Sequence, residues 1–257
     1  MVRYSKAVAN KPYRQAGHGA PTFRYKKIKS ELRANGKLRY SDNEMITRVA
    51  RHNNRQAVQE LHAKTGKTYG HIDIERTCHN VTLKAPGDGS DESILREYKR
   101  VLRSHGVTKR NKASNVLVEV VVSLRDHGYR RWHKYFAACL RFIETEFGAD
   151  RVLTAHIHLD QDHPHMHVLI VPIIDGCRHL NANKLVGWKA DTNGRFDRFC
   201  EQVAERFGLT REGTSQFTEI MTSKGVGPGL CKDPAPSVRN LRLTNRSSGA
   251  LTDNADS

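Results

Sequence analysis

The sequence predicts an α+β fold, a mostly antiparallel sheet with helices packed on one face. Three observations support this prediction. Residues 151–159 and 165–174 are strand-like and joined by the polar turn DQDHP, which is typical of an antiparallel hairpin. Residues 115–124 (NVLVEVVVSL) are rich in β-branched side chains and indicate a buried strand. Segments with helical spacing separate the strands, so helices can cover one sheet face and leave the other free for a site.

The amino-terminal half opens with a segment that contains several Pro and Gly residues. We expect residues 1–22 to form a flexible basic arm, and the chain from Phe23 (FRYKKIKSELR) to be more ordered. Apolar residues at helical spacing predict one helix over residues 43–64. Residues 73–83 end in a short strand-like stretch. The turn PGDGSD then precedes a helix that Gly106 stops.

The carboxyl-terminal half contains two further helical patterns. One covers residues 131–147 and is stopped by Gly148, and the other covers about 189–207. The chain beyond is rich in Gly, Pro, Ser and Asn, and we expect residues 214–257 to be a mostly disordered tail. The sequence therefore predicts one main domain over residues 23–213.

The charge of the chain indicates a polyanionic partner. Its 43 Lys and Arg exceed its 27 Asp and Glu, which gives a formal net charge of +16. Residues 1–67 hold 16 of these cations and four carboxylates, a local difference of +12. A basic excess of this size favours nucleic acid as the partner, whereas a solvated basic arm without specific function is the simpler alternative.

Cysteine usage and hydropathy indicate a cytoplasmic protein. The five cysteines are odd in number and form no C-x-x-C pair, so neither a disulfide framework nor a cysteine zinc site is predicted. No apolar run approaches the roughly 18 residues that a membrane-spanning helix needs. The first residues also lack the apolar core of a signal peptide.

Four histidines alternate with apolar residues along the predicted hairpin. His156 and His158 share one face of the first strand, and His165 and His167 share one face of the second. A hairpin brings His158 beside the other pair, and neutral imidazoles are strong ligands for divalent transition metals. With an oxygen from Gln161, three or four protein ligands leave open positions, which is typical of a catalytic metal site.

Simpler interpretations of the hairpin are ordinary polar-face histidines or a structural zinc site. Asp160 and Asp162 are weaker candidates for ligands, and both are assigned here to the turn. His163 lies in the same loop and is expected to face solvent. One histidine is easily explained without a metal, but four that alternate across a hairpin favour the metal site.

The segment H-L-D-Q-D-H-P-H-M-H, residues 158–167, resembles the third motif of the Pre/Mob (MobV) plasmid recombination and mobilisation proteins, which belong to the HUH endonucleases. R-H-N-N-R, residues 51–55, together with the earlier FRYKKIKS, is similar to the first motif of that family. Residues 73–83, with Asn80, are similar to the second. The resemblance covers about residues 23–213 and implies an HUH relaxase-like sandwich.

The resemblance assigns roles to individual residues. It implies that His52 is the nucleophile, with Arg55 beside it as a second catalytic residue. The implied metal ligands are His158, Gln161, His165 and His167. Residues expected to contact DNA are Arg24, Lys26, Lys27, Arg51, Asn53 and Asn80.

Two positions depart from the family pattern. The fourth ligand of the family is usually glutamate, so Gln161 keeps an oxygen donor but lacks the negative charge. The second motif usually reads Asn-Tyr, where this chain has Asn80-Val81, so no tyrosine nucleophile exists there and His52 is favoured. Other tyrosines that remain candidate nucleophiles are Tyr25, Tyr40 and Tyr69. Aromatic residues that are candidates for base stacking are Phe23, Tyr25, Tyr69 and Trp188.

The function that the resemblance implies is site- and strand-specific DNA nicking and strand transfer at a plasmid origin of transfer, through a covalent histidine–DNA intermediate. Mn²⁺ or Mg²⁺ is the expected cofactor, and Zn²⁺ also fits the ligands. Plasmid DNA is the expected partner, with coupling to a host conjugation system. The alternatives are a noncatalytic DNA-binding protein on the same fold and a tyrosine-dependent replication initiator or transposase. A metal hydrolase of small molecules leaves the basic amino-terminal region unexplained.

Overall fold

The computed structural model describes residues 21–29, 40–69, 71–108, 115–124 and 131–209. The predicted tail, residues 214–257, lies outside these ranges. So does the predicted arm, residues 1–22, except for its last two residues, and Thr22 already belongs to the first strand. None of the described helices is long and apolar enough to cross a membrane.

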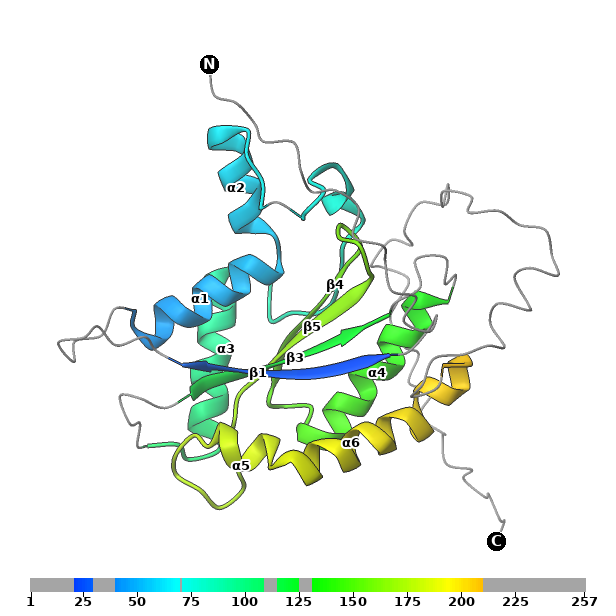
Figure 1. Ribbon diagram of the computed structural model, residues 1–257. Coiled ribbons are helices and arrows are strands. Elements are labelled where there is room, and N and C mark those ends of the chain that lie inside the picture. Colours follow the sequence, from blue (N-terminus) through cyan, green and yellow to red (C-terminus); the bar gives the residue numbers. More distant parts are fainter. Residues whose placement is uncertain (1–20, 30–39, 70, 109–114, 125–130, 210–257) are drawn as a thin grey trace, which may run out of the picture. The chain divides into compact units, whose positions relative to one another are not determined.

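Five strands form one sheet in which every pair of neighbours is antiparallel, in the order β1-β3-β5-β4-β2 (Figure 1). The strands are β1 Thr22–Lys29, β2 Val81–Lys84, β3 Asn115–Ser123, β4 Val152–His158 and β5 His165–Ile170. The α+β class with a mostly antiparallel sheet is therefore confirmed. The edge strand β1 comes from a segment whose basic sequence did not identify it as a strand.

The helices and the two 3-10 segments lie between and after the strands. They are α1 Asp42–Asn53, α2 Gln56–Thr65, η1 Glu75–His79, α3 Asp91–Ser104, α4 Trp132–Phe147, α5 Ala182–Val186, α6 Lys189–Gln202 and η2 Ala204–Phe207. Local sequence explains their ends. Ser41 and Glu44 form a reciprocal capping box at the start of α1, and Ser90 accepts a hydrogen bond from the Ser93 N–H at the start of α3. Gly148, at φ +92°, ends α4.

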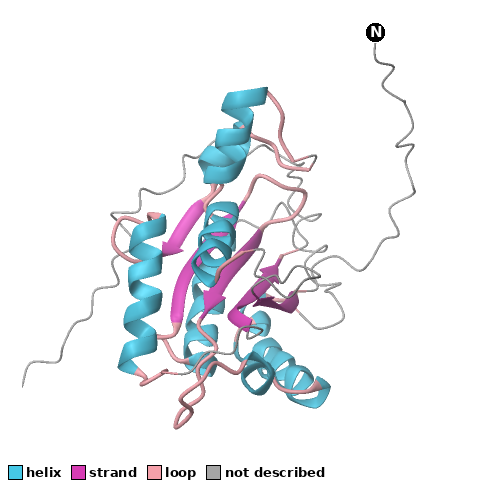
Figure 2. Ribbon diagram, turned by 90° about the vertical axis from the view of Figure 1, so that its left-hand side faces the viewer, coloured by secondary structure: helices cyan, strands magenta, loops and turns pink. Residues whose placement is uncertain are grey.

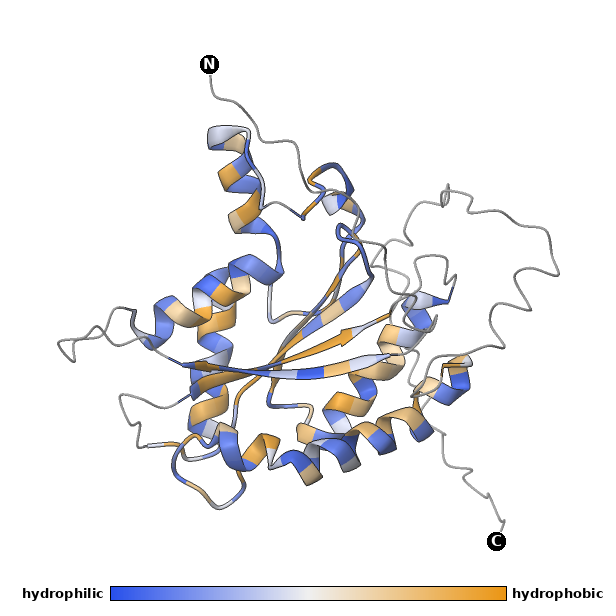
Figure 3. Ribbon diagram, in the orientation of Figure 1, coloured by the Kyte–Doolittle hydropathy of each residue, from blue (hydrophilic) through white to orange (hydrophobic). Residues whose placement is uncertain are grey.

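Helices cover both faces of the sheet, which corrects the expectation that they cover one face only (Figure 2). Alternate residues of the central strands, such as Val118 and Val168, pack against α4, α5 and α6. Their neighbours Leu117 and Leu169 face the other way and pack against apolar residues of α1 and α3. Strand β3, which lies between β1 and β5, is mostly apolar, as its colour in Figure 3 shows, and both of its faces are buried along most of its length.

The second face is divided along the strands. Its one end is the apolar cluster with α1 and α3, and its other end carries the polar residues Glu119, His158, His165 and His167. The expectation of a free face thus holds for only part of it. The end of α1 and the loop before η1 border this polar part, through contacts described below.

Candidate functional site

The β4–β5 hairpin brings three of the four predicted ligands together. In its register His158 lies opposite His165, and His156 lies opposite His167. One ring nitrogen from each of His158, His165 and His167 lies within 4.8 Å of the others, a separation that fits shared coordination of one ion. His156 is on the same face, but its Nδ1 lies 3.0 Å from the Thr82 hydroxyl of β2, outside the cluster.

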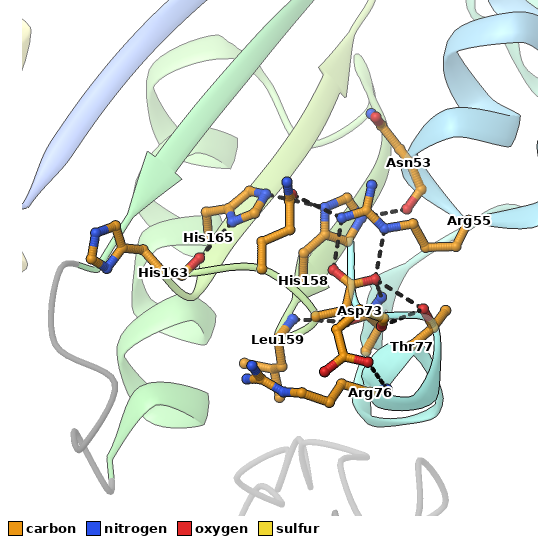
Figure 4. Close-up of polar contacts among 12 residues, drawn as sticks. Asn53, Arg55, Asp73, Arg76, Thr77, His158, Leu159, His163 and His165 are labelled. Atoms are coloured by element: carbon orange, nitrogen blue, oxygen red, sulfur yellow. Dashed lines mark hydrogen bonds and ion pairs between the residues drawn. The ribbon is translucent and has the colours of Figure 1, made fainter. Parts of the chain in front are cut away.

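Hydrogen bonds fix which nitrogen of His158 and of His165 is free. His158 Nε2 donates to the Asn53 carbonyl at 2.6 Å, and His165 Nδ1 donates to the His163 carbonyl at 2.7 Å, since a carbonyl only accepts (Figure 4). The other two nitrogens, His158 Nδ1 and His165 Nε2, face each other at 3.3 Å. In neutral rings both carry lone pairs, so a cation or proton between them stabilises the arrangement.

Burial keeps these two rings neutral. Together with the charge of the neighbouring His167, it holds the pKa of His158 far below the ordinary range and lowers the pKa of His165 to about 4. Both rings are therefore unprotonated at neutral pH, where their facing lone pairs are donors suited to a metal ion. The donor set of this site fits a divalent transition metal.

His167 is held by Glu119, a residue that the sequence analysis did not identify. The carboxylate Oε1 of Glu119 accepts from His167 Nδ1 at 2.8 Å and from the Asn53 side chain at 2.9 Å. Burial alone would raise the pKa of Glu119, but hydrogen bonds and charge from His167, with the bond from Asn53, lower it to about 2. The one charged residue in the apolar strand NVLVEVVVSL was the available signal.

Arg55 lies between α1 and α2 rather than on one continuous helix, so the single helix over residues 43–64 was wrong. Its backbone is left-handed, with φ +65°, and the Gln56 N–H bonds to the Asn54 side chain instead of extending α1. The side chain is 2% exposed and donates to both carboxylate oxygens of Asp160, at 2.8 and 2.7 Å. This buried ion pair outweighs the helical propensity of the segment.

Asp160 is a buried acceptor and not simply a turn residue. Besides Arg55, it accepts from the Asn80 amide at 2.7 Å and the Thr77 hydroxyl at 3.2 Å. Burial opposes its ionisation, but these bonds, led by the one from Arg55, hold its pKa below the usual value. Asn80 also accepts from the Leu159 N–H at 2.7 Å, so the second motif is hydrogen-bonded to the end of β4.

Gln161, the predicted fourth ligand, lies beside this network. Its side-chain oxygen accepts from Arg55 at 2.9 Å, the same guanidinium that binds Asp160. Ligation by Gln161 stays a prediction.

His52 occupies the last turn of α1, directly before Asn53. The residue is exposed, and its ring lies edge-on to Tyr69, with ring centroids 6.3 Å apart. Desolvation, followed by the charges of Arg55 and His167, lowers the pKa of His52. The structure thus places the predicted nucleophile one residue before Asn53, whose carbonyl binds His158, and the lowered pKa of His52 favours its neutral ring.

The predicted DNA contacts separate into two groups. Arg24 and Lys26 of β1 lie on the sheet face that carries the cluster, and Lys26 Nζ is 3.8 Å from Glu119 Oε2. Lys27 lies on the opposite face, where its Nζ donates to Asn183 at 2.6 Å. Arg24, Lys26 and Lys27 are all exposed.

The remaining predicted DNA contacts bind within the protein. The Asn53 side chain is 1% exposed and supports Glu119, so its assignment to DNA is corrected to a positioning role. Arg51 forms ion pairs with Glu60 and Asp91, which tie α1 to its neighbouring helices. Asn80 binds Asp160, as described above.

The fold and site together define a class of protein in which a helix-covered antiparallel sheet carries a three-histidine cluster, bonded to the end of a helix whose last turn holds a further histidine. The chain belongs to the plasmid recombination enzyme (Mob_Pre) family, whose sequence model matches residues 35–222. The resemblance inferred from the motifs is therefore confirmed.

Curated relatives agree with this assignment. Plasmid recombination enzyme type 1 of Staphylococcus aureus is 31% identical over 180 residues, which are 66% of this chain and 44% of that protein. A type 3 enzyme of Mammaliicoccus lentus is 31% identical over 175 residues, 66% of this chain and 40% of that protein. The chain thus spans less than half the length of these relatives.

The fold also matches solved structures. The relaxase domain of MobM, in an Mn-bound crystal structure with plasmid pMV158 oriT DNA, aligns with a TM-score of 0.55 and 18% identity, covering 75% of this chain and 89% of that one. A second MobM structure with a different oriT oligonucleotide gives a TM-score of 0.52 and covers 79% and 98%. At this identity the likeness establishes the fold.

Proposed function

We propose that this protein nicks one strand of plasmid DNA at an origin of transfer and transfers that strand, using His52 as nucleophile and a divalent metal at the histidine cluster. One observation carries the proposal. Three imidazoles converge with their second nitrogens already bound to Asn53, His163 and Glu119, beside the exposed ring of His52. Such outer partners orient metal ligands, and an adjacent nucleophile completes the requirements for phosphoryl transfer.

The metal would be held by His158, His165 and His167, with Gln161 as the proposed fourth donor. Bound there, it would polarise the scissile phosphate and offset the charge that develops in the transition state. Three imidazoles favour Mn²⁺ or Zn²⁺ over Mg²⁺, which prefers oxygen ligands. The Mn in the MobM relaxase domain agrees with the first of these. We therefore propose Mn²⁺.

His52 would supply the attacking atom. Its lowered pKa leaves a ring nitrogen with a free lone pair at neutral pH. As the N–P bond forms, the bond from phosphorus to the 3′ oxygen breaks, and that oxygen takes a proton from solvent to become the 3′ hydroxyl. The 5′ phosphate stays on His52 as a phosphoramidate, and attack by a 3′ hydroxyl reverses the step. Strand transfer rather than hydrolysis results.

Cations of β1 would hold the DNA backbone on the same face. Arg24 and Lys26 lie on the cluster face of the sheet and are exposed. Phosphate contacts of this kind position a strand without reading its sequence. Plasmid DNA is the proposed partner, as the MobM complexes with oriT DNA suggest by analogy. Coupling to a host conjugation system is part of the same proposal.

The test is nicking of a supercoiled plasmid that carries the DNA flanking this gene, in Mn²⁺ or in EDTA. We expect relaxation with Mn²⁺ only, protein bound covalently to the new 5′ end, and loss of both in His52→Ala and in His165→Ala. His133→Ala is the matched control, since His133 lies on α4 and packs with Trp132. Binding without cleavage would instead support the noncatalytic DNA-binding alternative.

A further inference from the structure

Tyr69 is an exposed aromatic side chain at the edge of the proposed site. Among the described residues, Tyr69 and Trp188 are the exposed large hydrophobic side chains, at 46% and 86% of their surface. Only Tyr69 lies beside the proposed nucleophile, with its ring edge-on to His52. Trp188 precedes α6, which packs on the other face of the sheet. An aromatic ring left open at this place is available to a ligand.

The backbone around Tyr69 is tied to the histidine hairpin. The Ile72 N–H donates to the Tyr69 carbonyl at 2.9 Å, and Ile72 is itself buried. The next residue, Asp73, donates its N–H to the Asp160 carbonyl at 2.9 Å. Asp160 directly follows Leu159 at the end of β4 and holds Arg55. These bonds link the backbone at Tyr69 to the end of β4, and the Tyr69 ring already lies against His52 before any partner binds.

We propose that Tyr69 forms a nucleobase subsite, in which the base next to the scissile phosphate stacks on its ring. The inference rests on the proposed function. A phosphate at His52 leaves the neighbouring base within reach of a ring that already contacts His52. Stacking tolerates any base, because every base has a π face, and it needs the ring of Tyr69 but not its hydroxyl. The cations Arg24 and Lys26 lie on the sheet face that carries the histidine cluster, where they would contact phosphates of the bound strand.

The first test measures binding without cleavage. In EDTA, the full chain is titrated with a 12-nucleotide oligo(dT) and with an abasic strand of the same number of phosphates. The ratio of the two affinities reports contacts to bases and cancels contacts to phosphates. We expect this ratio to fall by about five-fold to 150-fold in Tyr69→Ala, the range that loss of one stacking aromatic gives, and to persist in Tyr69→Phe. Trp188→Ala is the matched control and should resemble the wild type.

The outcomes of these measurements separate the subsite from other roles of Tyr69. An unchanged ratio in Tyr69→Ala overturns the proposal. Loss of nicking in Tyr69→Phe, with the ratio intact, would leave the subsite in place and overturn His52 as the nucleophile, because the hydroxyl of Tyr69 would then be the attacking group. Slower nicking in Tyr69→Ala at an unchanged ratio would mean that the ring only orients His52. If the wild type binds bases through Tyr69 but never nicks, the subsite stands and the proposed chemistry fails.

Discussion

The two faces of the β4–β5 hairpin carry alternate residues of the same strands, and the residues of each face have a different role. Ile157, Met166 and Val168 are completely buried and pack against the helices of the first face. The residues that alternate with them, His158, His165 and His167, form the histidine cluster on the second face. Residues that stabilise the fold and residues suited to chemistry can therefore alternate along the same two strands, because successive side chains point to opposite faces of a sheet.

Substitutions at two adjacent residues of β5 should have opposite effects on metal binding and on stability. We expect His165→Ala to abolish Mn²⁺ binding, while the metal-free protein stays as stable as the wild type or gains stability, because one of two facing lone pairs is removed. Met166→Ala should lower the free energy of unfolding by about 2–5 kcal/mol and leave Mn²⁺ affinity unchanged. Calorimetric titration and denaturant unfolding measure the two quantities. Similar stability losses in both variants would contradict the separation.

A substitution of Arg55 measures how much the polar end of the second face contributes to stability. Arg55→Met leaves the buried Asp160 without its cation, and we expect a loss of about 3–5 kcal/mol in the free energy of unfolding. Arg198→Met is the control, because Arg198 also binds one carboxylate, that of Glu146, through two nitrogens but is half exposed. Its loss should be about 0–1 kcal/mol. Equal losses, measured by urea unfolding, would show that burial of the Arg55 pair is unimportant.

Glu119 should affect the metal affinity of the cluster through its bond to His167. Glu119→Gln keeps the shape of the side chain but removes the charge that accepts from His167 Nδ1. We expect Mn²⁺ affinity to fall by about 10-fold to 100-fold, the usual cost of altering an outer partner of a metal ligand. Glu146→Gln, on α4, is the control and should not change Mn²⁺ affinity. A wild-type affinity in Glu119→Gln would remove Glu119 from the site.

Two adjacent lysines of β1 should differ slightly in how they affect the salt dependence of DNA binding. Lys26 lies on the cluster face, and Lys27 lies on the other face near Asn183. In Lys26→Ala, we expect the slope of log affinity for oligo(dT) against log salt to shrink by about 0.7, as one phosphate contact is lost. Lys27→Ala should keep the wild-type slope. Equal changes in both would mean that β1 binds DNA by diffuse charge.

Much of the fold could be read from the sequence because its signals are periodic. The hairpin, β3, α3 and α4 follow from apolar spacing and from caps such as Ser90 and Gly148. β1 could not be found this way, since FRYKKIK is basic at an exposed edge and only Ile28 is buried. Periodicity also cannot locate a break such as Arg55, where a distant carboxylate decides the backbone.

The site was predictable where a motif is local and hidden where it depends on tertiary contacts. Three histidines on one hairpin converge by strand alternation alone. Glu119 and Asn53 reach them from β3 and α1, and nothing in the spacing along the chain relates these elements. Lys27 was grouped with Lys26 because both are basic, although alternation along an edge strand separates them.

The bond from His158 to the Asn53 carbonyl has a consequence for the electrostatics of α1. Asn53 is the last residue of that helix, so its carbonyl is one of the acceptors that a helix end leaves without a partner in the helix. Aligned peptide dipoles give such an end a partial negative charge of about half an elementary unit. His158 therefore terminates the dipole of α1, and an ion bound to the histidines would lie one imidazole ring away from the negative pole of the helix that carries His52.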